Sequence, residues 1–121
     1  MRREQLAALA RLAGAQKDAD LARLAGVSVR LNAAVRARDD LEAALAQEIA
    51  VATAQPDMQL LRMLDAHVIL AEKSRTGLEA EITRITHEKD AMRQICAKSF
   101  GRAEVLAQLG KSASHKKNAN F

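Results

Sequence analysis

The sequence predicts an all-α protein, namely an antiparallel two-helix coiled-coil hairpin with a flexible basic C-terminal tail. Three observations lead to this fold class. Alanine, the strongest helix former, provides 26 of the 121 residues. The chain has no Trp or Tyr and only two Phe, so the large side chains that fill a globular core are missing. Leu and Ile recur at steps of three and four residues, which is the spacing of a coiled-coil seam.

The first helix is predicted over about residues 4–54, where the apolar residues keep to one seam and no proline interrupts them. The opening residues, MRREQLAALARLAGAQ, have the basic and Leu/Ala-rich character of a signal peptide, but Arg11 breaks the apolar stretch. We therefore expect these residues to belong to the helix. The predicted seam positions are Leu6, Leu9, Ala13, Leu24, Val27, Leu31, Ala34, Leu41, Leu45, Glu48 or Ile49, and Ala52.

A turn is predicted near residues 55–57, around the only proline of the chain. Pro56 has no amide hydrogen and disfavours helix at Gln55, but it suits the first turn of a new helix, where Asp57 complements the helix dipole. This combination indicates that one helix ends at this point and a second helix begins. A continuous helix kinked at Pro56 is the alternative, because proline alone does not force a reversal.

The second helix is predicted over about residues 57–109, with a seam that alternates three- and four-residue steps without a break. If the chain reverses at the proline, residues whose numbers sum to about 112 or 113 face each other. Leu31 then meets Ile82, and Leu45 meets Val68. The layers match along both arms, which favours the hairpin over the kink. The predicted seam positions are Leu61, Leu64, Val68, Ala71, Arg75, Leu78, Ile82, Ile85, Lys89, Met92, Cys96, Ser99, Ala103 and Leu106.

The seam pattern is lost from Gly110 onward, in the segment GKSASHKKNANF. We expect residues 111–121 to form a flexible basic tail. The hairpin then makes a single domain over residues 1–110.

Charge is sorted between the two ends of the predicted hairpin. Residues 39–72, around the turn, contain seven Asp and Glu against Arg62, whereas residues 91–121 contain six Lys and Arg against Glu104. Solvated helix surface explains any single charge, but opposite fields at two ends predict two different partners. The candidate partner-binding residues are Arg2, Arg3, Arg93, Lys98, Arg102 and Lys111 at the basic end, and Asp39, Asp40, Met63, Ile69 and Leu70 at the tip near the turn.

The tip also carries apolar residues that the seam does not use. With Leu61 and Leu64 facing inward, the residues Met63, Ile69 and Leu70 point outward. An exposed apolar patch of this kind indicates a partner surface or self-association. Incidental exposure or a locally rotated helix is the alternative.

The chain lacks the features of a catalytic site. A two-helix coiled coil offers almost no concave pocket in which a nucleophile or an acid–base pair can act. His67, His87 and His115 are too far apart for one local metal site, and Cys96 falls on the seam, where a packed thiol is expected. We therefore expect no enzymatic activity, cofactor, metal or small-molecule substrate. Without aromatic interleaving or a known binding module, the basic end is not expected to bind nucleic acid.

No apolar run approaches the about 18 residues that span a bilayer, and the single cysteine fits a reducing compartment. We therefore expect a cytoplasmic protein.

Two stretches give the chain a resemblance to a known family. LAALARLAGAQKDADLARL, residues 6–24, and EKDAMRQICAKSFGRAEVLAQL, residues 88–109, resemble the FliJ family of flagellar and type III export proteins. Proteins of this family are antiparallel coiled coils similar to the central shaft of rotary ATPases. The resemblance implies a stalk whose paired termini enter the pore of a hexameric export ATPase, while other parts engage the membrane-embedded export gate or export chaperones.

Two other functions remain open on the sequence. An export chaperone of similar helical build would bind a secreted subunit along an apolar groove. A structural coiled coil would join only itself or another helix.

Overall fold

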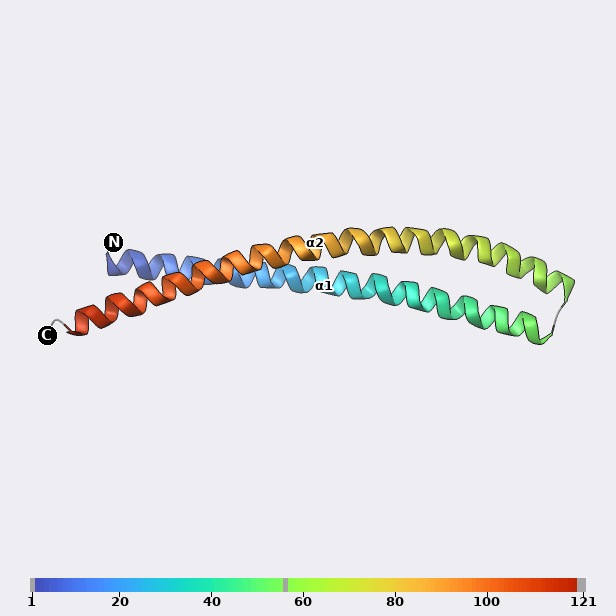
Figure 1. Ribbon diagram of the computed structural model, residues 1–121, viewed down its shortest axis with the longest axis horizontal. Coiled ribbons are helices and arrows are strands. Elements are labelled where there is room, and N and C mark those ends of the chain that lie inside the picture. The colour runs from blue at the N-terminus through green and yellow to red at the C-terminus, as the bar shows by residue number, and fades with distance from the viewer. Residues whose placement is uncertain (1, 56, 120–121) are drawn as a thin grey trace. The chain divides into compact units, whose positions relative to one another are not determined.

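The computed structural model describes residues 2–55 and 57–119, and of residues 114–119 it describes only the helical backbone. Helix α1 (Arg3–Ala54) and helix α2 (Met58–Ala119) pack together as an antiparallel hairpin (Figure 1). The predicted all-α fold class is confirmed, and the alternative of one continuous kinked helix is wrong. Pro56, on which the turn prediction rested, lies outside the described residues.

The helix ends near the turn have local causes. α1 ends at Ala54, and the amide of Gln55 still donates to the Val51 carbonyl at 3.3 Å. Asp57 caps α2, because its Oδ1 accepts the amide of Gln59 at 3.2 Å. The carboxylate thus satisfies an amide that has no partner inside the helix. This role is more specific than the favourable dipole contact expected of Asp57.

The second helix extends further than predicted. α2 continues to Ala119, about ten residues beyond the end expected at residue 109. The loss of the apolar pattern predicts a flexible tail over residues 111–119, and the structure has helix there instead. These residues contain neither proline nor glycine, so nothing in their local chemistry ends a helix that has already formed.

The chain divides into two compact units, and both helices contribute to each. Unit 1 comprises Met1–Val27 with Glu88–Phe121, and unit 2 comprises Ser28–His87. Unit 1 buries Leu6, Val27 and Cys96 as its apolar core, while unit 2 buries Ala34, Ala52 and Ile85. Each core is narrow, because two helices shield only the strip of residues between them.

The predicted seam of α2 accounts for its burial. Ile85, Cys96 and Ser99 are buried, and the other predicted positions from Leu64 onward are half-buried, except Arg75. Leu61 is also an exception, since it is 42% exposed while Leu60 is half-buried beside the turn. The coiled-coil spacing therefore predicts the contact strip of α2. The half-buried seam positions are Leu64, Val68, Ala71, Leu78, Ile82, Lys89, Met92, Ala103 and Leu106.

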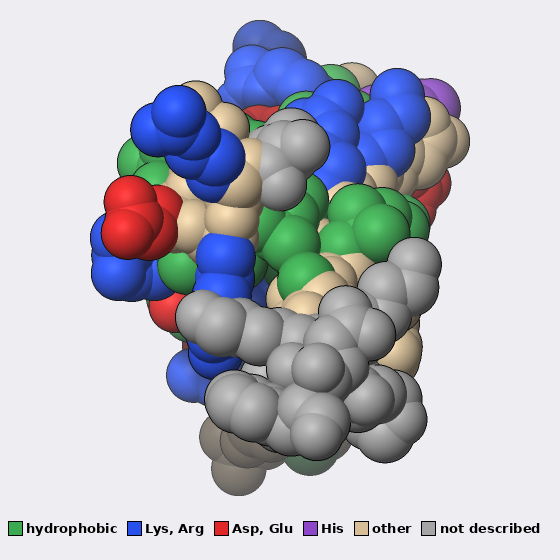
Figure 2. Space-filling model, turned by 90° about the vertical axis from the view of Figure 1, so that its left-hand side faces the viewer, with side chains coloured by type: hydrophobic (Ala, Val, Ile, Leu, Met, Phe, Trp, Pro, Cys, Tyr) green, Lys and Arg blue, Asp and Glu red, His purple; other side chains and the backbone are tan. Residues whose placement is uncertain are grey.

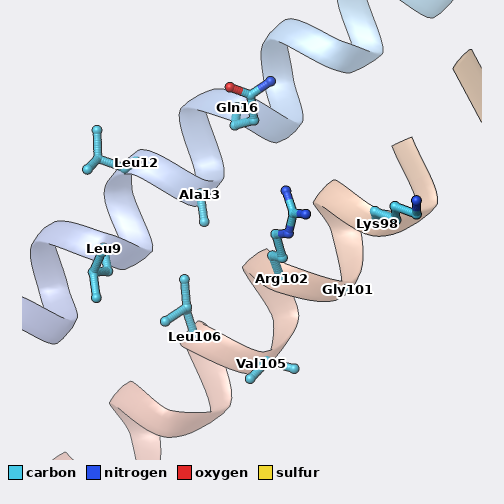
Figure 3. A pocket seen from close by; sticks show the side chains of 9 residues that line it. All are labelled: Leu9, Leu12, Ala13, Gln16, Lys98, Gly101, Arg102, Val105 and Leu106. Atoms are coloured by element: carbon cyan, nitrogen blue, oxygen red, sulfur yellow. The ribbon is translucent and has the colours of Figure 1, made fainter. Parts of the chain in front are cut away.

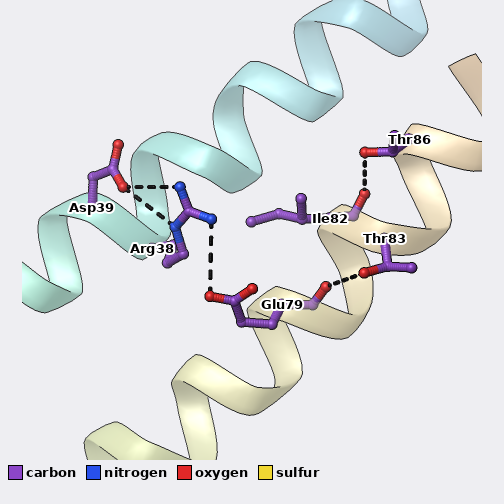
Figure 4. Close-up of polar contacts among 6 residues, drawn as sticks. All are labelled: Arg38, Asp39, Glu79, Ile82, Thr83 and Thr86. Atoms are coloured by element: carbon purple, nitrogen blue, oxygen red, sulfur yellow. Dashed lines mark hydrogen bonds and ion pairs between the residues drawn. The ribbon is translucent and has the colours of Figure 1, made fainter.

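The predicted register between the two helices of unit 2 is wrong. Arg38 extends to Glu79 with 3.8 Å between Nη1 and Oε1, and the side chain of Ile82 points toward α1 on the side of Arg38 (Figure 4). Glu48 extends to His67, with 3.0 Å between Oε2 and Nδ1. These pairs have residue sums above the 112 or 113 that a tight reversal gives.

The shift arises at the start of α2. Met58 is 68% exposed and Leu61 is 42% exposed, so the first turn of α2 contributes little to the seam. Packed helix axes lie about 8–10 Å apart, and the chain must cross that distance before α2 can pack against α1. The seam of α2 therefore begins a few residues later than a symmetric turn allows.

Burial predicts which isoleucine supports the fold. Ile85 is 2% exposed and Ile95, on the same helix, is 44% exposed. We expect Ile85→Ala to lower the free energy of unfolding by about 2–4 kcal/mol, because it leaves a cavity in the seam. Ile95→Ala is the matched control and should cost less than about 0.5 kcal/mol in urea unfolding. Equal losses in the two variants would contradict this assignment of the core.

The register predicts which cysteine pairs can be linked within one chain. In a Cys96→Ala background, Leu45→Cys with Ala71→Cys should react with a short bifunctional thiol reagent several times faster than Leu45→Cys with Val68→Cys. The reason is that Leu45 and Ala71 line the same two grooves. Crosslinking yield on a denaturing gel measures the difference. A faster reaction of the Val68 pair would restore the register expected from a tight reversal.

Candidate functional site

The six residues predicted at the basic end all belong to unit 1. The structure places Arg2 just before α1, Arg3 at its first position and the other four along α2, all of them exposed. At the end of the molecule that carries the termini, Lys and Arg side chains flank exposed hydrophobic ones (Figure 2). Unit 1 contains twelve Lys and Arg against six Asp and Glu, a formal charge of +6. Positive charge is therefore concentrated in the unit that holds both chain ends.

Two of these cations line a groove between the helices of unit 1, which we call the basic groove. It has a volume of about 710 Å³. Arg102 and Leu106 of α2 extend toward Ala13 of α1 (Figure 3). Arg93 is not part of the lining, and its guanidinium lies 3.8 Å from Asp90. The lining residues are Leu9, Leu12, Ala13, Gln16, Lys98, Gly101, Arg102, Val105 and Leu106.

The apolar part of the basic groove was not predicted. Leu12 is 67% exposed and Val105 is 57% exposed, although both are large aliphatic residues. A cluster of uncovered aliphatic side chains usually marks an interaction surface. The signal in the sequence was that Leu12 and Val105 fall outside the seam without being replaced by polar residues. The groove can therefore hold an apolar side chain beside an acidic group.

A buried polar pair lies behind the basic groove. Asp20 is 1% exposed and Ser99 is 3% exposed, and the Ser99 hydroxyl donates to Oδ2 of Asp20. Gln16, which lines the groove, donates from Nε2 to Oδ1 of Asp20 at 3.0 Å. Arg23 lies 3.8 Å from the same oxygen. The carboxylate therefore ties the two helices together and orients a groove residue.

These contacts change the acidity of Asp20. The hydrogen bond from Ser99 is the largest cause that lowers the pKa of this carboxyl below its ordinary value, and the bond from Gln16 and the charges of Arg23 and Arg102 act in the same direction. Burial opposes them but does not prevail. The side chain therefore remains a carboxylate at neutral pH.

Asp20 was missed in the sequence because aspartate is rarely buried. Its position still carried a signal, since Ala13, Lys17, Asp20 and Leu24 continue the seam by steps of four, three and four residues. Spacing alone therefore indicated the contact strip at a place where residue type argued against it.

The tip residues predicted near the turn are all exposed. Met63 is 52%, Ile69 60% and Leu70 61% exposed. Asp39 and Asp40 are also exposed, and Asp39 accepts two hydrogen bonds from the Arg38 guanidinium at 3.3 Å. Ile69 lines neither of the grooves beside Met63 and Leu70, because a helix rotates 100° per residue between Ile69 and Leu70.

Met63 and Leu70 belong to two adjoining grooves between the helices of unit 2, which together we call the unit 2 surface. The grooves have volumes of about 270 and 250 Å³. Glu48 and His67 line both of them, and Oε2 of Glu48 lies 3.0 Å from Nδ1 of His67. The lining residues are Leu41, Ala44, Leu45, Gln47, Glu48, Val51, Leu60, Met63, Leu64, His67, Leu70, Ala71 and Ser74.

Three comparisons of the chain, with protein-family models, curated proteins and solved structures, find no match. Among the described residues, no group of three or more His, Cys, Asp and Glu side chains is placed to hold a metal ion. In the part of the chain that the structure describes, neither helix has an apolar stretch long enough to cross a membrane.

The lowered pKa of Asp20 predicts a pH-dependent contribution to stability. The stability that this carboxylate contributes is present above the ordinary pKa of 3.8 and is lost as the pH falls through the lower pKa of the folded state. Wild type should melt at a higher temperature than Asp20→Asn at about pH 7, and the gap should close toward about pH 2.

The matched control for this measurement is Asp18→Asn, which changes an exposed carboxylate on the same helical turn. Its melting temperature should follow that of wild type across the pH range. A gap between wild type and Asp20→Asn that does not change with pH would contradict the charged role of Asp20.

Proposed function

We propose that the protein is a non-enzymatic stalk or adaptor of a flagellar or type III protein export apparatus. In this role it links a hexameric export ATPase to the export gate or to export chaperones. The observation that carries the proposal is the pairing of residues 6–24 and 88–109 in unit 1. These are the two stretches that resemble the FliJ family, and they come together in the cationic unit that contains both chain ends.

The chemistry of unit 1 supports contact with an acidic partner. Its formal charge of +6 attracts a carboxylate-lined pore or cleft and speeds association with it. Lys98 and Arg102 supply charge next to the aliphatic lining, so that a partner can bury apolar groups and pair its carboxylates at the same place. The function needs no cofactor, metal or small-molecule substrate. The proposed location is the cytoplasm, with the inner membrane reached only through the export gate.

An export chaperone is the second candidate, and the basic groove favours it. A volume of about 710 Å³ with exposed Leu12 and Val105 accepts the apolar face of a helix from a secreted subunit. Co-purification with a hexameric ATPase favours the stalk, and co-purification with one secreted subunit favours the chaperone. A coiled coil with a purely structural role would retain only another helix or a second copy.

Charge reversal tests which unit meets the ATPase. Changing Arg93, Lys98 and Arg102 together to Glu should raise the Kd for a hexameric export ATPase by about 100-fold and reduce its salt dependence. The three positions are exposed, so helicity by circular dichroism should stay nearly unchanged. Fluorescence anisotropy at two salt concentrations measures both effects.

The control reverses charge near the turn, in Asp39→Lys with Asp40→Lys. This variant should bind the ATPase with the affinity of wild type. If it loses the ATPase while the triple variant retains it, the two ends have been assigned the wrong way round. If both variants still bind the ATPase with the affinity of wild type, the electrostatic basis of the proposal is wrong.

A further inference from the structure

Unit 1 leaves the apolar lining of the basic groove uncovered. Leu12 and Val105 are more than half exposed, and Leu9 is 39% exposed. Lys98 and Arg102 line the same groove, in a unit with a formal charge of +6 (Figure 3). An occupant that matches this chemistry combines apolar side chains with carboxylates.

The unit 2 surface offers that combination. Val51, Met63 and Leu70 are each more than half exposed, and Glu48 lies among them. Asp40 precedes Val51 by eleven residues, or three helical turns, and so lies on the same face of α1. Unit 2 contains seven Lys and Arg against nine Asp and Glu, a formal charge of −2.

We propose that the basic groove is occupied by the unit 2 surface of a second copy of this chain. Met63 and Leu70 are seven residues apart, which is the spacing with which a helix places anchors in a groove. Glu48 and Asp40 supply carboxylates for Lys98 and Arg102. The contact joins two different surfaces, and the smallest assembly that contains it is a dimer.

Charge selects this pairing over the like-with-like alternative. Pairing unit 1 with unit 1 would place two formal charges of +6 next to each other, whereas the proposed contact joins +6 to −2. The inference does not rest on a role in export. If that role holds, the dimer covers the groove assigned to the ATPase, and self-association competes with partner binding.

Two charge-reversed variants test the contact in the purified full-length chain. The groove variant is Lys98→Glu with Arg102→Glu, and the surface variant is Asp40→Lys with Glu48→Lys. Sedimentation equilibrium should show wild type as a dimer that weakens with salt, while each variant alone should dimerise about 100-fold more weakly. Mixing the two variants should restore the dimer, because every contact in the mixed pair again joins opposite charges.

Two further variants separate charge from shape. Gly101→Leu fills the basic groove without changing charge, and an added Cβ at this position meets no atom within 4 Å, so the helix accepts it. It should also weaken the dimer. Arg93→Glu is the matched control outside the groove and should leave the dimer unchanged.

Several outcomes would overturn the inference. A wild-type monomer at all concentrations, a dimer that either variant leaves intact, or a mixture that fails to recover would each do so. The sedimentation measurement contains no ATPase, so a result against the dimer does not contradict the proposed export function. In the same way, a result against ATPase binding does not contradict the dimer.

Discussion

Two packed helices can bury only one strip of each, and this limit governs both units of the protein. The buried strip includes small residues such as Ala34, Ala52 and Cys96 where a globular core would have larger ones. Large aliphatic residues therefore remain on the outside in both units, as Leu12 and Leu70 show. A chain of this build stabilises itself through a narrow seam and keeps large aliphatic side chains available for other molecules.

A narrow seam with few large side chains specifies the register only weakly, because small residues fit one another in several alignments. The polar contacts of the seam discriminate better. Asp20 and Ser99 in unit 1 are both buried, and their hydrogen bond forms in only one alignment. Arg38 and Glu79 in unit 2 are partly exposed, so their contact constrains the register less. A buried carboxylate without its donor is costly, so a slip at Asp20 is disfavoured in a way that a slip between two alanines is not.

The same pair connects the seam to the basic groove. Asp20 accepts a hydrogen bond from Gln16 and lies within electrostatic reach of Arg102, and both of these residues line the groove. The polar group that aligns the helices therefore also holds part of the surface proposed for partners. This coupling gives unit 1 a preorganised cationic site rather than a set of independent surface charges.

The sequence by itself determined the helical class, the break at the proline and the seam of α2, because these depend on propensity and on spacing along one helix. It also determined the separation of charge, which is a property of composition. Only the tertiary structure decided the register, since the crossing at the start of α2 depends on the distance between two helices. The apolar part of the basic groove and the burial of Asp20 were likewise decided only by the tertiary structure. Each needs side chains from α1 and α2 at one place, and the pattern of a single helix cannot show which residues of the other helix lie opposite.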